Sequence, residues 1–266
     1  MKLISHELPL DLMIKHELEI NDYTYVLLHK LIEDEAYANA IMDIRKSKPL
    51  RLIYLDNSCY ELGASLDNNL LRQWSDKISA SIVILPDVLG DCDMTLSRTF
   101  EYLDEYPSAA TGGMAVMQGS SPDEMIHCYA ELRDYRSEFD QPIEMIGIPF
   151  VFRWIERDPT LQANERIRLL QMMDDRRIID RNRSHHLLGT WQASEFLSYR
   201  KYGWVWSIDT SNPVMAAIDG TPYSIDGLRE KPKATFDSAY HLKTGDIDMD
   251  LLYSNINKFR SIVNDR

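Results

Sequence analysis

The chain alternates short apolar runs with longer segments whose apolar residues recur at helical spacing. Runs of the first kind predict strands and segments of the second kind predict helices. We expect strands over residues 3–4, 23–28, 50–54, 81–85, 114–117, 144–148, 185–188 and 204–208. We expect helices over residues 31–45, 66–78, 93–105, 121–137, 163–173, 193–202 and 247–263. This alternation is typical of an α/β protein with a parallel sheet.

Most of the expected strands end at a polar residue or a glycine. These residues are Asp56, Asp87, Gln118, Gly147, Gly189 and Asp209. They are mostly separated by about 30 residues, the length of one strand-helix unit. Six such units and two N-terminal strands make eight, which predicts a (β/α)8 TIM barrel with its active-site groups at the C-terminal ends of the strands. A doubly wound sheet is the structural alternative, but no strand leads into a Gly-rich dinucleotide motif.

The length of 266 residues suits one large domain with a substantial core. We expect a single barrel domain over residues 1–266, with the chemistry-bearing motifs in 51–213 and a C-terminal loop and closing helix in 219–266. Hydrophobic residues make up 44% of the chain and charged residues 27%, as in an ordinary water-soluble protein. The sequence predicts no membrane span and no targeting segment, so we expect a cytoplasmic location.

Three cysteines far apart in the sequence argue against a disulfide framework and against a zinc site, so we expect no metal. The net charge of -13 disfavours long-range attraction to a polyanion, so a nucleic-acid surface would need local cations. Two runs offer them, although each run taken separately is more typical of a solvated surface. They contain Arg176, Arg177, Arg181 and Arg183 with His185 and His186, and then Arg229, Lys231 and Lys233.

Three aspartates at one barrel mouth suit the cleavage of a glycosidic bond. One carboxylate can attack the anomeric carbon, a second can move a proton, and a third can accept hydrogen bonds from a base. Each of them alone is also a common loop or cap residue. Tyr60 can stack on a flat ring or simply pack, and Gln118 can bind a purine edge or only a loop.

Taken in order, six short motifs resemble the tRNA-guanine transglycosylase superfamily, and most closely its phage-type branch, the 7-deazaguanine DNA transglycosylases. The motifs are Leu55-Asp56-Asn57-Ser58-Cys59-Tyr60-Glu61, Leu85-Pro86-Asp87, Val116-Met117-Gln118-Gly119, Ile146-Gly147-Ile148-Pro149, Leu187-Leu188-Gly189 and Ser207-Ile208-Asp209-Thr210-Ser211. The resemblance covers about residues 51–213. It implies a TIM barrel that exchanges guanine for a 7-deazaguanine in a nucleic acid.

The resemblance also implies roles for individual residues. Asp209 matches the nucleophile that forms a covalent intermediate with the sugar, and Asp56 matches the general acid/base. The remaining matches lie at the base-binding pocket, and they are Asn57, Tyr60, Asp87, Gln118, Gly147 and Gly189. Contacts to phosphates are expected from the basic runs, namely from Arg181, Arg183, Arg229, Lys231 and Lys233.

The sequence departs from the tRNA enzymes in two places, and the second departure, the missing zinc module, favours DNA as the substrate. Their Asp-Ser-Gly-Gly loop is Asp56-Asn57-Ser58-Cys59 here, and their C-terminal zinc module has no counterpart. The resemblance then implies a pentosyltransferase that needs no cofactor, inserts preQ0 or a derivative into DNA, and protects a phage genome against restriction in the host cytoplasm. A guanosine inside a duplex is out of reach, so the DNA must be single-stranded or the base flipped out.

The expected partners are therefore DNA and a free 7-deazaguanine base, with a homodimer partner or an accessory protein as a further source of phosphate contacts, and no membrane. Two alternatives stay open at this point: an enzyme that acts on tRNA, and a barrel that binds a base or nucleotide without catalysis. The carboxylates alone are also compatible with a glycoside hydrolase, which the Pro86-Asp87 and Gln118-Gly119 motifs do not support.

Overall fold

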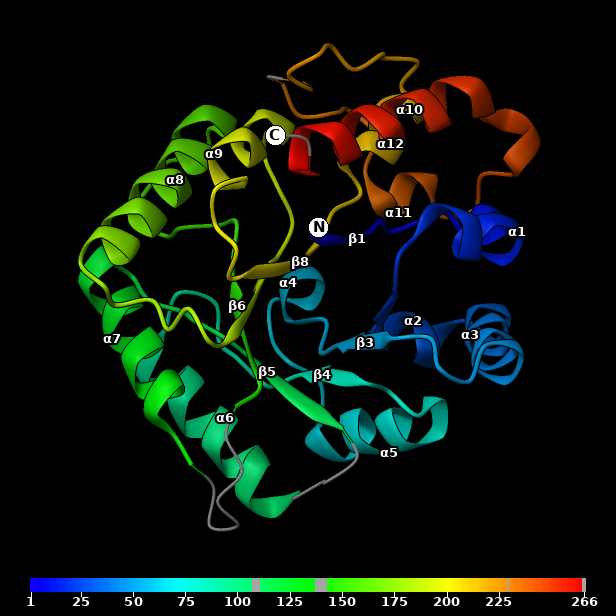
Figure 1. Ribbon diagram of the computed structural model, residues 1–266. Helices are drawn as coiled ribbons and strands as arrows, with labels where there is room; N and C mark the ends of the chain where they lie inside the picture. Colours follow the sequence, from blue (N-terminus) through cyan, green and yellow to red (C-terminus); the bar gives the residue numbers. More distant parts are fainter. Residues whose placement is uncertain (107–110, 137–142, 229, 265–266) are drawn as a thin grey trace.

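Eight parallel strands form the centre of the molecule in the computed structural model, which describes residues 1–106, 111–136, 143–228 and 230–264. The strands are β1 (Leu3–Ser5), β2 (Thr24–Leu27), β3 (Ile53–Asp56), β4 (Ile82–Ile84), β5 (Gly112–Val116), β6 (Met145–Ile148), β7 (Ser184–Leu187) and β8 (Val205–Asp209). Their order is β1-β8-β7-β6-β5-β4-β3-β2, and every hydrogen-bonded pair is parallel (Figure 1). The predicted (β/α)8 barrel is confirmed, and each expected strand is present.

Helices surround this barrel (Figure 1). They are α1 (Leu10–Ile20), α2 (Leu28–Glu33), α3 (Glu35–Ser47), α4 (Cys59–Leu62), α5 (Asn68–Ile78), α6 (Cys92–Glu105), α7 (Pro122–Asp134), α8 (Pro159–Asp175), α9 (Phe196–Tyr199), α10 (Asn212–Ile218), α11 (Phe236–Ala239) and α12 (Met249–Asn264). Two 3-10 turns, η1 (Ala193–Glu195) and η2 (Thr244–Asp246), complete the set. No described helix is both long enough and apolar enough to cross a membrane.

The helix predictions differ from the structure mainly in four places, and the short helices α4 and α11 were also not predicted. The helix expected over residues 31–45 is two helices, because the Asp34 side chain accepts hydrogen bonds from the backbone of Ala36 and Tyr37 and so starts α3 anew. The helix expected over 193–202 is only η1 followed by α9, and α10 was not predicted. Neither was α1, whose core-facing positions include the buried Glu17, a charged residue that interrupts the apolar pattern.

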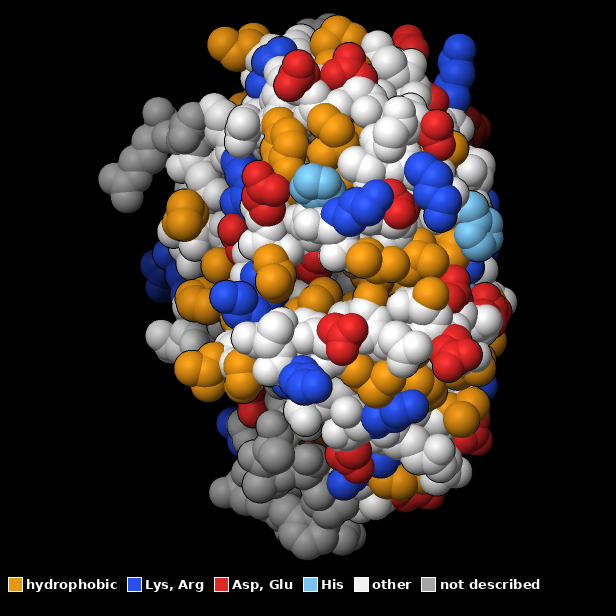
Figure 2. Space-filling model, turned by 90° about the vertical axis from the view of Figure 1, so that its right-hand side faces the viewer, with side chains coloured by type: hydrophobic (Ala, Val, Ile, Leu, Met, Phe, Trp, Pro, Cys, Tyr) orange, Lys and Arg blue, Asp and Glu red, His pale blue; other side chains and the backbone are white. Residues whose placement is uncertain are grey.

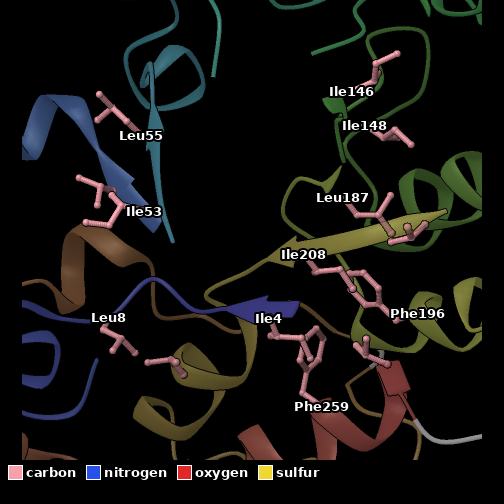
Figure 3. Packing of buried hydrophobic residues seen from close by; sticks show 14 of the residues in the cluster. Ile4, Leu8, Ile53, Leu55, Ile146, Ile148, Leu187, Phe196, Ile208 and Phe259 are labelled. Atoms are coloured by element: carbon pink, nitrogen blue, oxygen red, sulfur yellow. The ribbon is translucent and has the colours of Figure 1, made fainter. Parts of the chain in front are cut away.

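The core has two layers, separated by the wall of the barrel. Alternate strand residues point to opposite sides, so Tyr54 lies inside the barrel while Ile53 and Leu55 point toward the helices. The outer layer is the larger one, and Figure 3 shows its strand side chains facing the surrounding helices. There Phe196 and Phe259 meet edge to face, with ring centroids 5.2 Å apart, beside β1 and β8.

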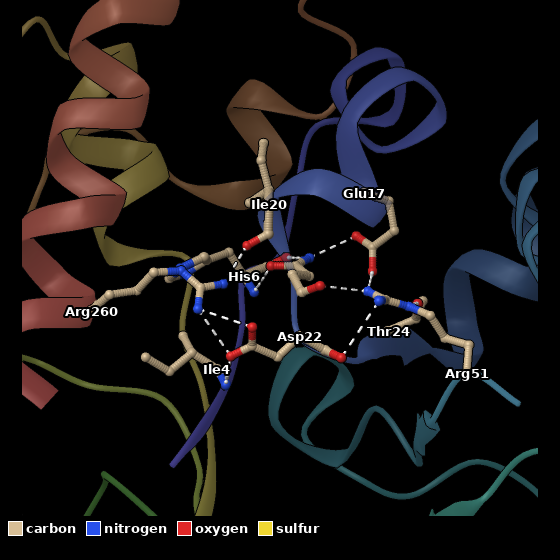
Figure 4. A network of polar contacts seen from close by, with 9 residues as sticks. Ile4, His6, Glu17, Ile20, Asp22, Thr24, Arg51 and Arg260 are labelled. Atoms are coloured by element: carbon tan, nitrogen blue, oxygen red, sulfur yellow. Dashed lines mark hydrogen bonds and ion pairs between the residues drawn. The ribbon is translucent and has the colours of Figure 1, made fainter. Parts of the chain in front are cut away.

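Side chains close the barrel at the seam between β1 and β2, the two ends of the sheet order. The backbone N–H of Ile4 donates to the Asp22 carboxylate (2.9 Å), and the N–H of Asp22 donates back to the Ile4 carbonyl (2.9 Å). The Asn21 amide bonds both the N–H and the C=O of His6, at 2.7 and 2.9 Å. Arg260 from α12 then holds the Asp22 carboxylate at 2.9 Å (Figure 4). These bonds satisfy β1 backbone groups that a neighbouring strand would otherwise pair.

Candidate active site

A cavity of about 660 Å³ lies at the C-terminal ends of the barrel strands. It collects polar side chains that are far apart in the sequence, because the C-terminal ends of all eight strands meet at one mouth. Among the lining residues are Asp56, Asp87, Gln118, Gly189 and Asp209. The strand-end pattern thus marked five residues that the fold brings to one cavity.

Asp209, the last residue of β8, is held through one of its two carboxylate oxygens. Its Oδ1 lies 2.8 Å from Nε2 of His186 and 3.3 Å from the backbone nitrogen of Gly189. No donor among the described residues reaches Oδ2. The side chain lines the cavity although it is largely buried. The second oxygen is therefore free for chemistry.

Asp56, the last residue of β3, is held by two short hydrogen bonds. The Tyr25 hydroxyl donates to Oδ2 at 2.5 Å, and the backbone N–H of Ser58 donates to Oδ1 at 2.5 Å. Burial raises the pKa of Asp56 to about 7, and the negative charge of Asp209 adds to this effect, while the two hydrogen bonds oppose it. A carboxyl group with such a pKa can both donate and accept a proton at neutral pH.

Asp87 follows β4 and is held by two amide side chains. Nδ2 of Asn57 donates to Oδ1 at 2.9 Å, and Nε2 of Gln118 donates to Oδ2 at 2.7 Å. Burial raises the pKa of Asp87, and these two donors oppose the rise because they stabilise the charged form. Gln118 is itself oriented by the backbone N–H of Gly90, which donates to Oε1 at 3.0 Å. The result is a buried carboxylate in a fixed orientation.

Asn57 contributes to this site mainly through Asp87. Its amide donates its second hydrogen to the Leu85 carbonyl (2.7 Å), and its oxygen accepts from the Cys59 N–H (2.8 Å). Both N–H bonds are thus used inside the protein, and only 2% of the residue is exposed. Asn57 was expected to bind the base, whereas in the structure it orients the Asp87 carboxylate.

The two glycines expected at the base pocket play different parts. Gly189 lines the cavity and has φ +53°, and a Cβ there would lie 2.6 Å from the Phe150 ring, so only glycine fits. Arg166, fully buried beneath it, donates to the Gly189 carbonyl at 2.9 Å and fixes this loop. Gly147 is not among the lining residues. Its missing side chain makes room for Leu188 and Val116, which do line the cavity.

Among the aromatic side chains that line the cavity are Tyr60 and Phe150. Tyr60 is 44% exposed and its ring centroid lies 5.1 Å from that of Phe150, which in turn lies 5.7 Å from that of the buried Trp191. Partly exposed rings such as Tyr60 are suited to stacking on a base. Tyr60 is therefore where the sequence placed it, whereas Phe150 was not predicted.

The predicted phosphate contacts are only partly at the mouth. Arg181 and Arg183 precede β7, at the opposite end of the barrel. Arg181 pairs with Asp174 (2.8 Å), and Arg183 donates to the Arg133 carbonyl (2.8 Å). The fold therefore does not bring these two arginines to the cavity, because they lie at the wrong end of their strand. Lys231 does line it, and Lys233 does not. Arg229 lies outside the described residues.

Two other cations reach the mouth from the loop between β6 and α8. Arg153 and Arg157 line the cavity, and Lys231 places its ammonium group 4.7 Å from the centre of the Trp191 ring. Burial lowers the pKa of Lys231, and the positive charge of Arg157 lowers it further. Among the residues that the structure describes, none of the three cations forms an ion pair. No sequence pattern marked the two arginines, since their place depends on the path of the loop.

Glu7 is a further residue that sequence reasoning missed. It lies two positions after the end of β1 and lines the cavity. Burial raises its pKa well above the usual range, and the neighbouring carboxylates Asp56 and Asp209 contribute to the rise. The same strand-end rule that marked Asp56 would have found it, had the end of β1 been placed at Ser5.

The fold and the site together define a (β/α)8 barrel with a carboxylate-lined cavity at the C-terminal ends of its strands. Within the described ranges, no group of three or more His, Cys, Asp or Glu side chains has a metal-binding arrangement. No protein-family model matches the chain, and a search of curated proteins finds no significant match. A fold alone does not define a function, so the side chains of the cavity are the guide to it.

Proposed function

We propose that this chain is a guanine transglycosylase that exchanges guanine in DNA for a 7-deazaguanine base such as preQ0 or a derivative. The observation that supports this proposal best is that Asp209, Asp56 and Asp87 line one cavity and that each has a different environment. Asp209 has one carboxylate oxygen that no described donor reaches, Asp56 has a pKa of about 7, and Asp87 accepts hydrogen bonds from two side-chain amides. Base exchange at a glycosidic bond needs a nucleophile, a proton carrier and an acceptor for the base.

The exchange proceeds in two displacements. Asp209 attacks C1′ of the guanosine, the bond from C1′ to N9 breaks, and guanine leaves with the electron pair while Asp56 supplies a proton. The 7-deazaguanine then attacks C1′ through N9, loses its N9 proton to Asp56, and displaces the Asp209 carboxylate. Two inversions at C1′ retain the anomeric configuration.

Asp87 explains the selection of the base. Its carboxylate still has lone pairs after accepting from Asn57 and Gln118, and these match the N1–H and amino donors of guanine. Adenine presents an acceptor at N1, which would face a buried carboxylate and be rejected. Guanine and a 7-deazaguanine share this edge, so the same pocket suits both the leaving and the entering base.

The cations at the mouth favour a polynucleotide over a free nucleoside. The face shown in Figure 2, which carries α1 and α3, mixes acidic and basic side chains and has no dominant positive patch. Arg153, Arg157 and Lys231 instead gather at the cavity, although the chain as a whole has a net charge of -13. Cations that form no ion pair within the described residues suit the phosphates on either side of the exchanged nucleoside.

Isotopically heavy guanine, incubated with separate pools of single-stranded DNA, duplex DNA and tRNA, tests the proposal. We expect the label to enter DNA with the wild type and not with Asp209→Ala or Asp209→Asn. Single-stranded DNA is expected to be the better acceptor, because no base has to be unpaired. Label entering only tRNA would change the substrate, and no exchange in any pool would contradict a transglycosylase.

A further inference from the structure

We propose that His186 is a positioning residue that orients the Asp209 nucleophile and selects its attacking oxygen. The inference rests on the proposed function, in which Asp209 attacks the sugar. His186 lies on β7, is fully buried, and contacts Asp209 Oδ1 through Nε2 at 2.8 Å. Its other ring nitrogen, Nδ1, lies 2.8 Å from Oγ of Ser207.

These two contacts define the tautomer of the ring. The Asp209 carboxylate only accepts hydrogen bonds, so Nε2 of His186 must carry the hydrogen. In a neutral ring Nδ1 is then an acceptor, and the Ser207 hydroxyl donates to it at 2.8 Å in preference to the Met145 sulfur at 3.9 Å. This arrangement is the one expected when a second partner fixes the ring of a functional histidine.

Aromatic rings prevent the imidazole from turning away. The Tyr25 ring is stacked on His186 at 6.2 Å with an angle of 12° between the planes. Tyr54 and Tyr23 contact the ring edge to face, at 5.9 and 6.4 Å. Because the Tyr25 hydroxyl also holds Asp56, one stacked pair fixes both the proposed nucleophile and the proposed proton carrier.

The donors on Asp209 decide which oxygen reacts. Oδ1 is held by His186 and by the Gly189 N–H, while no described donor reaches Oδ2. Oδ2 therefore forms the bond to C1′, and Oδ1 becomes the carbonyl oxygen of the sugar ester. A carboxylate accepts hydrogen bonds more strongly than an ester does, so the two donors also favour the release of Asp209 when the second base attacks.

The chain offers a matched control in the adjacent histidine. His185 is also fully buried, but it points to the outside of the barrel, where its Nε2 lies 2.9 Å from the Tyr129 hydroxyl. His185→Leu and His186→Leu thus remove equally buried imidazoles from neighbouring positions of one strand. Only the second change removes a donor to Asp209.

The test measures single-turnover and steady-state base exchange on the folded fraction of each variant. We expect His186→Leu to lower kcat about 100-fold, the effect of removing one donor to a reacting oxygen, with KM for the free base unchanged. Release of Asp209 should slow most, so the covalent adduct should accumulate. His186→Gln, which keeps an N–H donor, should recover most of the loss, and His185→Leu should retain wild-type kcat.

Two results would overturn the inference: equal kcat for folded His186→Leu and His185→Leu, or no recovery in His186→Gln. Lack of exchange by the wild type would instead contradict the proposed function. In that case ¹⁵N NMR of the imidazole rings still tests the geometry without any activity. A hydrogen on Nε2 of His186, absent from Nδ1, supports the positioning role, and the opposite tautomer refutes it.

Discussion

Removal of the Tyr25 hydroxyl should move the pH dependence of base exchange in a known direction. In Tyr25→Phe the aromatic ring stays on His186, and only the hydroxyl that donates to Asp56 at 2.5 Å is lost. This donor stabilises the charged carboxylate and so lowers the pKa of Asp56, which burial otherwise raises to about 7. The variant should therefore have a higher pKa at Asp56 than the wild type.

The size of this change follows from the hydrogen bond. A hydrogen bond to a charged group contributes about 1.5–3 kcal/mol. One pKa unit corresponds to about 1.36 kcal/mol, so the midpoint of the Asp56 limb in a plot of kcat/KM against pH should rise by about 1 to 2 pH units. The direction is the same whether Asp56 acts as the acid or as the base, because both limbs follow its titration.

The assay is the pH profile of base exchange, measured beside a control two residues earlier in the chain. Tyr23, which directly precedes β2, lies with Tyr25 in the interior of the barrel. Tyr23→Phe removes a buried hydroxyl that donates to the Ile208 carbonyl at 2.8 Å and does not contact Asp56. Its profile should keep the wild-type midpoint. A midpoint in Tyr25→Phe that is unchanged, or that falls, would refute the assignment of Asp56 as the proton carrier.

Three further predictions concern base recognition, phosphate binding and the loop after β3. Asp87→Asn should raise KM for the free base about 10- to 100-fold, because it removes a charged acceptor, and steady-state kinetics with varied base would show it. Arg157→Ala should raise KM for DNA and reduce the salt dependence of DNA binding by about one released counterion. Arg181→Ala, at the far end of the barrel, should change neither KM nor the salt dependence. Ser58 has φ +61°, a left-handed conformation that favours glycine, and its hydroxyl contacts His29 Nδ1 at 2.8 Å. Ser58→Ala and Ser58→Gly both lose this contact, but only the alanine keeps the backbone strain. The free energy of unfolding of Ser58→Ala should therefore be about 1 kcal/mol lower than that of Ser58→Gly, measured by denaturant unfolding. Equal stability of the two variants would contradict the strain.

The sequence was sufficient to predict the barrel and the carboxylates at its mouth. Asp56, Asp87 and Asp209 each follow an apolar run, and parallel strands carry such residues to one end whatever the details of packing. The same rule failed for basic residues that precede a strand. Arg181 and Arg183 belong to the other end of the barrel, so their position relative to β7 already separates them from the cavity.

The residues that hold the carboxylates could not be predicted in the same way. All four residues of β2 are buried, so its sequence lacks the polar and apolar alternation that would show which side chains face the interior. Tyr25 therefore resembles any core tyrosine in the sequence. The register pairs it with Tyr54, and only its hydroxyl, along the interior of the barrel, reaches Asp56. His186 and His185 are likewise indistinguishable in the sequence, although one faces Asp209 and the other faces α7.

The origin of each group suggests how the proposed chemistry and the choice of substrate are separated in this fold. Tyr25 and His186, which orient the two reacting carboxylates, belong to strands of the barrel: β2 pairs with β3, and β7 is paired on both sides. Arg153, Arg157 and Lys231 instead belong to loops. Groups on strands hold a reactive geometry more closely than groups on loops, and loops tolerate change. Substitutions in the two loops should therefore alter which nucleic acid is bound while leaving the rate of the chemical step intact, and substitutions on β2 or β7 should do the reverse.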